Sequence, residues 1–262
     1  MFKLLQSENG FVHVCGHRGN SIASPENTLA ALTATRDSGG TSAEIDVMLT
    51  ADHEIVLMHD DFLDRTTNGK GLVSKATLAE IKSLDAGSWF GKQFAGERVP
   101  TLAEALAHAQ SIGIGLVTEI KEFQNVEPLL NKLAETAKSM GAFEHAIFIS
   151  FDHTVLTKLK QRNPAFRTEG ILHARHVDVA QLAKTANLDS VSIEHMMFRP
   201  EDGQALHDAG VAVRMHLMRP EEYALYREHG VDLLQDVPHW VEQGVIDTIS
   251  GDDVSFLAGF LP

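Results

Sequence analysis

The sequence of 262 residues contains a single cysteine, Cys15. An internal disulfide is therefore excluded, and with it the disulfide framework that stabilises many small secreted proteins. The chain also lacks a run of about 18 apolar residues that could cross a membrane as a helix. Its first residues, MFKLLQSENG, lack the apolar core of a signal peptide. These absences predict a cytoplasmic protein, with a cleaved leader as the alternative.

Basic residues are scarce, because 22 Lys and Arg stand against 36 Asp and Glu and leave a formal net charge of −14. Such a chain repels nucleic acid and anionic membranes. We therefore expect a small-molecule substrate, no nucleic-acid partner and no stable membrane association. If the substrate is an anion, a local site must overcome the overall charge, and a divalent cation among carboxylates would do so. The oligomeric state is not indicated by the sequence.

Short β-rich runs alternate with helix-like stretches along most of the chain. Such alternation predicts a parallel sheet covered by helices, and the length matches the roughly 250 residues of a (β/α)8 TIM barrel. We predict an α/β fold of this type, as one domain over residues 1–262. The candidate strands are 11–15, 43–48, 54–59, 114–120, 146–150, 168–172, 190–194, 211–216 and 231–235.

Nine candidate strands are one more than the barrel holds. The suspect is 54–59, because only a few residues separate it from the run before, and a parallel crossover needs about a dozen or more. It is either a hairpin-like excursion or a barrel strand reached by an extended return. Residues 60–100 then break the pattern and are too long for a plain loop. They predict a small insertion beside the barrel mouth, in which Trp89 and Phe90 form a core of their own rather than shield a substrate.

Charged and polar side chains gather at the ends of the early candidate strands, which in a barrel converge at the face where active sites lie. The residues concerned are His17, Arg18, Glu44, Asp46, His59, Glu119 and Lys121. Glu44 and Asp46 are two apart and so point to the same face of their strand. Each pattern alone also fits an ordinary surface pair, and it is the combination that predicts a site.

The three acids Glu44, Asp46 and Glu119 lie in mostly apolar runs, where burial is costly without a partner. A metal ion supplies such a partner. Three carboxylates without a cysteine ligand favour a hard cation, Mg²⁺ or Ca²⁺, over Zn²⁺.

Phosphate recognition fits the remaining residues. Arg18 offers a planar fork to phosphate oxygens, and Lys121 offers a point charge. Two imidazoles, His17 and His59, are suited to take and give protons near neutral pH. With the metal, these groups predict hydrolysis of a phosphodiester.

These residues, and the motifs that contain them, resemble those of the glycerophosphodiester phosphodiesterase family. The resemblance runs from residue 11 to 240. It is carried by HRG (17–19), PENT (25–28), EIDVMLTADHEIVLMHDDFLDRTTNGKG (44–71), GSWF (87–90), VPTLAEAL (99–106), TEIK (118–121), SFD (150–152) and GVDLLQDVP (230–238). It implies a TIM barrel with a small insertion, and hydrolysis of glycerophosphodiesters to an alcohol and sn-glycerol 3-phosphate.

The resemblance also implies roles for single residues. His17 and His59 correspond to the acid–base pair of the family, and Arg18 and Lys121 to its phosphate contacts. The metal ligands of the family correspond to Glu44, Asp46 and Glu119.

The late strands depart from the family pattern. His216 stands where the family has an aromatic residue, and Gln235 replaces a Thr in the expected last strand. Glu194 and His195 add polar side chains at another strand end. We expect His195, His216 and Glu194 to line the pocket for glycerol or the leaving alcohol, with ordinary rim residues as the alternative.

Three more residues are expected to be structural. Glu26 would cap the helix that begins there rather than approach the metal, and Asp60 and Asn68 would fix loops.

Two other functions stay open. A related lysophospholipase D or phospholipase C-like lipid hydrolase should show an exposed apolar rim or an amphipathic membrane helix, and the sequence shows neither clearly. A catalytically inactive scaffold should have lost a metal ligand or a histidine, and none is lost.

Overall fold

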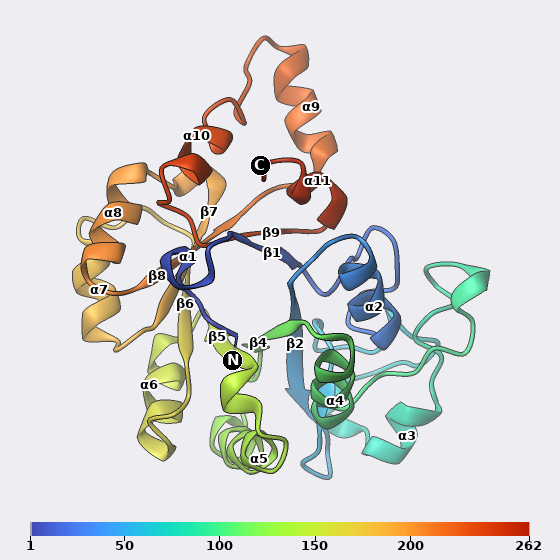
Figure 1. Ribbon diagram of the computed structural model, residues 1–262. Helices are drawn as coiled ribbons and strands as arrows, with labels where there is room; N and C mark the ends of the chain where they lie inside the picture. Colours follow the sequence, from blue (N-terminus) through green and yellow to red (C-terminus); the bar gives the residue numbers. More distant parts are fainter. Residues whose placement is uncertain (1, 262) are drawn as a thin grey trace.

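The barrel is formed by eight parallel strands within residues 2–261, the part of the chain that this computed structural model describes. The order around the ring is β1-β9-β8-β7-β6-β5-β4-β2, and pairing of β1 with β2 closes it (Figure 1). The predicted (β/α)8 barrel is therefore confirmed. The strands are β1 (His13–Gly16), β2 (Ser42–Leu49), β4 (Gly115–Ile120), β5 (Ala146–Ser150), β6 (Thr168–Leu172), β7 (Ser190–Glu194), β8 (Ala212–His216) and β9 (Thr248–Gly251).

The ninth strand of the described residues, β3 (Ile55–Leu57), lies outside the ring. It pairs antiparallel with β2, and Val47 is opposite Leu57. The short connection allows only this geometry, because a parallel return would need a long crossover. The run at 54–59 is therefore the hairpin-like excursion of the two possibilities that the sequence left open.

Helices cover the outside of the ring in Figure 1. The signals that predicted α4 (Leu102–Ile112) are confirmed: Thr101 and Glu104 form a capping box, and Gly113 ends the helix in the left-handed conformation. The other helices are α1 (Gln6–Asn9), α2 (Leu29–Asp37), α3 (Leu78–Ser83), α5 (Val126–Ser139), α6 (His153–Arg162), α7 (Val179–Thr185), α8 (Pro200–Asp208), α9 (Pro220–Glu228), α10 (Val237–Glu242) and α11 (Val254–Ala258).

The predicted last strand, 231–235, is wrong. This segment is a turn between α9 and α10, and the barrel closes instead with β9. Leu234 is buried in the layer between strands and helices, which explains the apolar signal of the segment. The true strand reads TISG, with one large apolar residue, Ile249. Short apolar runs do not distinguish strands from other buried segments.

The main core lies between the ring and its helices and divides into two large clusters. Leu116 of β4 packs with α4 and α5 in one cluster, and Val213 of β8 packs with the late helices in the other. Full burial of one such side chain contributes about 1.5–3 kcal/mol. These clusters hold the strands in the register that aligns their carboxyl ends.

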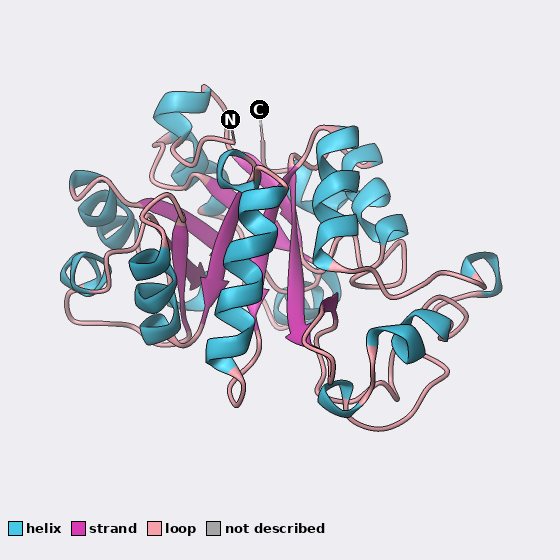
Figure 2. Cartoon of the chain, turned by 90° about the horizontal axis from the view of Figure 1, so that it is seen from below, coloured by secondary structure: helices cyan, strands magenta, loops and turns pink. Residues whose placement is uncertain are grey.

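Residues 60–100 contain α3 and the short 3-10 helices Val73–Lys75 and Lys92–Phe94. In Figure 2 this region extends from the end of the barrel to which the strand arrows point. A small cluster that includes Leu63, Val73 and Ile81 packs on the hairpin of β2 and β3.

Trp89 and Phe90 are not in this cluster, so the expectation that they form the core of the region is wrong. Trp89 is 41% exposed, and its ring contacts Phe90 edge to face. That residues 60–100 form an insertion within one domain stays a prediction. No helix within residues 2–261 is long and apolar enough to span a bilayer.

Candidate active site

The turn after β1 places His17 and Arg18 at the mouth of the barrel. Gly19 makes this turn possible, because its φ is +82° and a Cβ atom there would lie 2.5 Å from that of Ala31. The Gly19 amide donates to the backbone oxygen of Glu44, at 3.1 Å. Arg18 also has a positive φ, and its amide donates to Oε2 of Glu44, at 2.9 Å. The turn is thus tied to β2.

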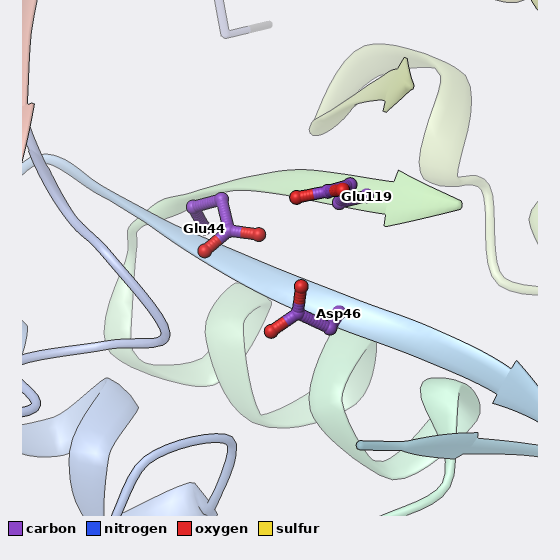
Figure 3. A group of neighbouring side chains, drawn as sticks. All are labelled: Glu44, Asp46 and Glu119. Atoms are coloured by element: carbon purple, nitrogen blue, oxygen red, sulfur yellow. The ribbon is translucent and has the colours of Figure 1, made fainter. Parts of the chain in front are cut away.

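Three carboxylates converge between β2 and β4 (Figure 3). Glu44 and Asp46 lie on the same face of β2, and the register of the two strands places Glu119 opposite Asp46. Ligand atoms of the three residues lie within 4.8 Å of one another, and all three residues are buried. The structure thus brings together the three acids that the sequence predicted as metal ligands.

Two of these acids are not fully satisfied by the protein itself. Within residues 2–261, Oε1 of Glu44 and Oδ1 of Asp46 are buried and have no hydrogen-bond partner. Burial, and next the charge of Asp46, raise the pKa of Glu44 to about 8. The same two causes raise the pKa of Glu119. Buried like charges carry a cost that either protonation of a carboxyl or a bound cation relieves.

A divalent cation fits this cluster. The donors are all carboxylate oxygens, which are the preferred ligands of Mg²⁺ and Ca²⁺. The unpartnered oxygens of Glu44 and Asp46 are available for coordination. Asn27 holds the other side of Asp46, because its Nδ2 donates to Oδ2 at 2.8 Å. The arrangement can therefore hold one hard cation at a fixed place.

Two cations of the protein border the acidic cluster. Nζ of Lys121 lies 3.1 Å from Oε1 of Glu119, and Nη1 of Arg18 donates to Oε1 of Glu26, at 3.1 Å. Nε of Arg18 is buried without a hydrogen-bond partner among the described residues. That Nε atom lies 3.5 Å from Oδ2 of Asp46, and the Arg18 side chain as a whole lines the cavity, where its positive charge suits an anionic ligand.

Glu26 does not cap a helix, so that expectation is wrong. The helix α2 begins at Leu29, and its first turn is capped by the side chain of Thr28. Glu26 instead accepts hydrogen bonds from Arg18 and from Arg65 of the region 60–100. Through these contacts it connects that region to the site.

Each predicted acid–base histidine has a carboxylate on its Nδ1 atom. Nδ1 of His59, which follows β3, lies 2.7 Å from Oδ1 of Asp60. Nδ1 of His17 lies 2.6 Å from Oδ1 of Asp252, which follows β9. Asp60 therefore does more than fix a loop, and the sequence patterns do not indicate Asp252. Asn68 does fix a loop, through reciprocal bonds with Asp85.

The pKa values of this pair shift in opposite directions. Burial works to lower the pKa of His17, but the hydrogen bond to Asp252 and the charge of Glu44 outweigh it and raise the pKa. Burial works to raise the pKa of Asp252, but its bond to His17 holds that pKa well below the usual range. The pair therefore favours a charged Asp252 beside a His17 that can carry a proton.

A cavity of about 280 Å³ joins these groups. The early-strand residues His17, Arg18, Glu44, His59, Glu119 and Lys121 line one part of it. The late strands supply the rest of the wall, including Glu194 and His216, together with Phe151, His173 and Arg214. The sequence patterns did not indicate these last three. Asp46 lies behind the wall, fully buried.

The late-strand residues differ in their contacts. The ring of His216 packs edge to face on His17, with 5.0 Å between centroids. Glu194 pairs with Nδ1 of His173, whose ring stacks on Phe151. His195 lies outside this cavity: its Nδ1 is 3.0 Å from the hydroxyl of Tyr223, and the side chain is buried.

A larger hollow, about 1110 Å³, lies at the opposite end of the barrel. Its walls include residues that precede strands, such as Gly40, Thr41 and Gly113. Within residues 2–261, the cluster Glu44, Asp46 and Glu119 is the one group of three potential metal ligands, and it lies at the other end. The chemistry therefore points to the smaller cavity.

Comparison with known proteins agrees with this geometry. The model of the glycerophosphoryl diester phosphodiesterase family matches residues 17–254. A glycerophosphodiester phosphodiesterase of Caldanaerobacter subterraneus is 41% identical over 161 residues, which cover 61% of this chain and 66% of that protein. The match thus spans just under two thirds of that relative. A glycerophosphodiester phosphodiesterase of Bacillus subtilis is 31% identical over 243 residues, which cover 87% of this chain and 80% of that protein.

Solved structures share the fold. A phosphodiesterase of Oleispira antarctica, in complex with the product sn-glycerol 3-phosphate, superposes with a TM-score of 0.80 at 29% identity. The superposition covers 97% of this chain and 98% of that one. A glycerophosphodiester phosphodiesterase of Agrobacterium tumefaciens superposes with a TM-score of 0.77 at 26% identity, over 95% of this chain and 100% of that one.

Proposed function

The chain belongs to the glycerophosphoryl diester phosphodiesterase family, and on this premise we propose that it hydrolyses glycerophosphodiesters to an alcohol and sn-glycerol 3-phosphate. The observation that carries the proposal is the buried cluster of three carboxylates, two of which keep an oxygen without a hydrogen-bond partner, beside a cavity lined by two histidines and two cations. The Oleispira phosphodiesterase, which binds sn-glycerol 3-phosphate, supports the same product here.

A divalent cation held by Glu44, Asp46 and Glu119 would supply positive charge that polarises the phosphate. Mg²⁺ and Ca²⁺ both suit these oxygens. Arg18 and Lys121 would bind the phosphate oxygens from the rim of the acidic cluster. Their charges also offset the overall negative charge, which otherwise repels an anionic substrate.

The two histidines would move the protons. One takes the proton of the glycerol 2-hydroxyl, whose oxygen attacks phosphorus in line. The other, protonated, gives its proton to the oxygen of the leaving alcohol as the bond from phosphorus to that oxygen breaks. Water then opens the cyclic phosphate with the roles reversed, which restores both His17 and His59. In each ring, the proton on Nδ1 is directed at a carboxylate, so Nε2 is the atom that exchanges protons.

The late-strand wall would hold glycerol or the leaving alcohol. Glu194 and His216 line the cavity beside Phe151, as the sequence predicted for the first two. His195 lies outside this cavity and bonds to Tyr223, but it borders an adjoining hollow of about 260 Å³ that His17, Glu194 and His216 also line. It therefore stays a candidate for the same wall.

The test is a panel of substrates assayed with Mg²⁺, Ca²⁺, Mn²⁺ or a chelator. We expect release of glycerol 3-phosphate from glycerophosphocholine and glycerophosphoethanolamine, lost with the chelator and restored by a divalent cation. Bis(p-nitrophenyl) phosphate lacks the 2-hydroxyl and should be cleaved more slowly. No chelator-sensitive release of glycerol 3-phosphate would contradict the proposal.

A lipid hydrolase is the second candidate, because several large apolar side chains are exposed, and one of them, Phe151, lines the cavity. Phe123 is 67% exposed, Phe62 54%, Phe151 40% and Leu72 37%. Phe62 and Leu72 form an isolated antiparallel β-bridge in the region 60–100. Leu72 and Phe123 line the same groove. Such a rim suits an acyl chain. Faster turnover of lysophosphatidylcholine than of glycerophosphocholine would favour this candidate.

A further inference from the structure

Asp252 lies beside His17 because of the closure of the barrel. The register of β1 and β9 places Gly16 opposite Gly251, so the next residue of each strand emerges at the same level. The His17 amide also donates to the backbone oxygen of Gly251, at 2.8 Å. Two residues that are 235 positions apart in sequence are thus held together by strand pairing.

The Asp252 carboxylate is itself held from both sides. Its Oδ1 accepts from Nδ1 of His17 at 2.6 Å, and its Oδ2 accepts from Nε of Arg219, the residue that precedes α9. Only 15% of its side-chain surface is exposed. The ring of His216 packs edge to face on that of His17, and Nδ1 of His216 lies 3.1 Å from Oγ of Ser250. The imidazole of His17 therefore has little freedom to turn.

His59 has the same arrangement from unrelated residues. Its Nδ1 lies 2.7 Å from Asp60, which accepts from Nε of Arg65 at 2.6 Å. Each histidine is thus hydrogen-bonded to a carboxylate, and an arginine in turn donates to that carboxylate. A carboxylate only accepts hydrogen bonds, so it places the proton on Nδ1 and leaves Nε2 for the cavity.

We propose that Asp252, supported by Arg219, is the positioning residue that fixes the tautomer and orientation of His17. This inference rests on the proposed function for its kinetic consequence. Asp252 itself does not line the cavity of about 280 Å³. It keeps Nε2 of His17 directed at the reacting groups, and its negative charge stabilises the imidazolium whenever His17 holds the proton that it transfers.

The first test is kinetic. Asp252→Asn keeps the shape but offers an amide that can donate to Nδ1 and favour the wrong tautomer. We expect kcat on glycerophosphocholine to fall by about 10–100-fold or more, with KM changed by less than about threefold and a similar melting temperature. Asp253→Asn is the matched control, because Asp253 only caps α11 through the amide of Phe256, and it should retain full activity.

The second test reads the tautomer directly and requires no turnover. Long-range ¹⁵N–¹H spectra of the histidine rings, with the His17 signals assigned from a His17→Gln variant, should show Nδ1 protonated in the parent protein. In Asp252→Asn this signature should be lost. If the parent protein fails to cleave any glycerophosphodiester but His17 shows the expected tautomer, the proposed function fails and the positioning role stands.

Two results would overturn the inference: an Asp252→Asn variant with kcat within about twofold of the parent protein, or a parent protein in which Nδ1 of His17 carries no proton. If Asp252→Asn does not fold, Arg219→Gln takes its place, because the Arg219 side chain is 57% exposed and its loss should be tolerated. We expect a fall in kcat of about two- to fivefold, in line with the loss of one exposed ion pair. An unchanged kcat in that variant would count against the proposal equally.

Discussion

Glu169 of β6 and the acids of β2 and β4 are buried in the same barrel, but their surroundings differ. Oε1 of Glu169 accepts from Nε of Arg214 at 2.7 Å, and Oε2 accepts from Oγ of Ser190 at 2.7 Å. Glu44 and Asp46 each keep one buried oxygen without a hydrogen-bond partner in the described part of the chain. Glu169 thus has its hydrogen-bond partners within the protein, whereas Glu44 and Asp46 each have an oxygen available to a ligand.

This difference shows which property indicates a binding site. Burial of a carboxylate alone does not, because Glu169 is buried with a complete set of partners. A buried carboxylate without hydrogen-bond partners destabilises the fold. Such a group is expected only where a ligand or a function compensates for that cost. The comparison thus supports the proposed chemistry at the ends of β1, β2 and β4, and a structural role for Glu169, whose partner Arg214 also lines the cavity.

The largest expected effect is on the histidines of the early-strand side. His17→Ala or His59→Ala should lower kcat on glycerophosphocholine by about 10²–10⁴-fold, because each removes a proton-transfer group. Binding of Mn²⁺, followed by calorimetry, should stay within about threefold of the parent value, because large losses of metal affinity are expected only when a metal ligand, or a group that orients one, is removed. Retained activity in either variant would contradict the assigned roles.

Substitution of the satisfied acid should damage the fold instead of the chemistry. Glu169→Gln leaves the buried Arg214 charge without its counter-ion and should lower the free energy of unfolding by about 3 kcal/mol. The double variant Glu169→Met with Arg214→Met is the control and should recover most of that loss. Chemical denaturation measures both. A Glu169→Gln variant as stable as the parent protein would contradict the proposed distinction between satisfied and unsatisfied acids.

Removing the charge of an unsatisfied acid should instead raise the free energy of unfolding. Glu44 has a pKa of about 8 in the folded protein because of burial and the Asp46 charge, against about 4.3 in the unfolded chain. Between these values the folded state holds a proton that the unfolded state lacks, so stability falls as pH rises. In chelator, the free energy of unfolding should therefore decrease from about pH 4.5 to pH 8.

Glu44→Gln is the matched variant for this pH dependence. It should flatten the slope and make the protein more stable than its parent at pH 8 when both are in chelator, because one buried charge is gone. An identical slope in the two proteins would show that Glu44 does not titrate as described.

The smallest expected effect is on the rim of the late-strand side. Glu194 pairs with His173 and is partly exposed, so Glu194→Gln should change KM for glycerophosphocholine by no more than about fivefold, the range of an exposed ion pair. Its kcat should be unchanged. A loss of kcat comparable to that of the histidine variants would place Glu194 in the proton-transfer machinery and break the comparison.

The sequence predicted the barrel and the early-strand cluster well, because both depend on local patterns. Alternating runs indicate strands and helices, and Glu44 and Asp46 share a face by spacing alone. The last strand was missed because TISG carries little apolar signal, whereas the buried Leu234 lies in a segment that is not a strand.

Contacts between distant segments could not be predicted. The pairing of Asp252 with His17 depends on how β9 closes the ring, and the pairing of Glu169 with Arg214 depends on β6 and β8 lying on either side of β7. Glu26 looked like a helix cap because its neighbours begin a helix, but two arginines from separate segments determine its role.

The most direct test of the central claim is a crystal structure of the protein soaked with Mn²⁺ and sn-glycerol 3-phosphate, measured near the manganese edge. We predict one anomalous peak between Glu44, Asp46 and Glu119, with the phosphate beside it and in contact with Arg18 or Lys121. A protein that binds no Mn²⁺ among these three carboxylates, or that holds the phosphate outside this cavity, would contradict the account.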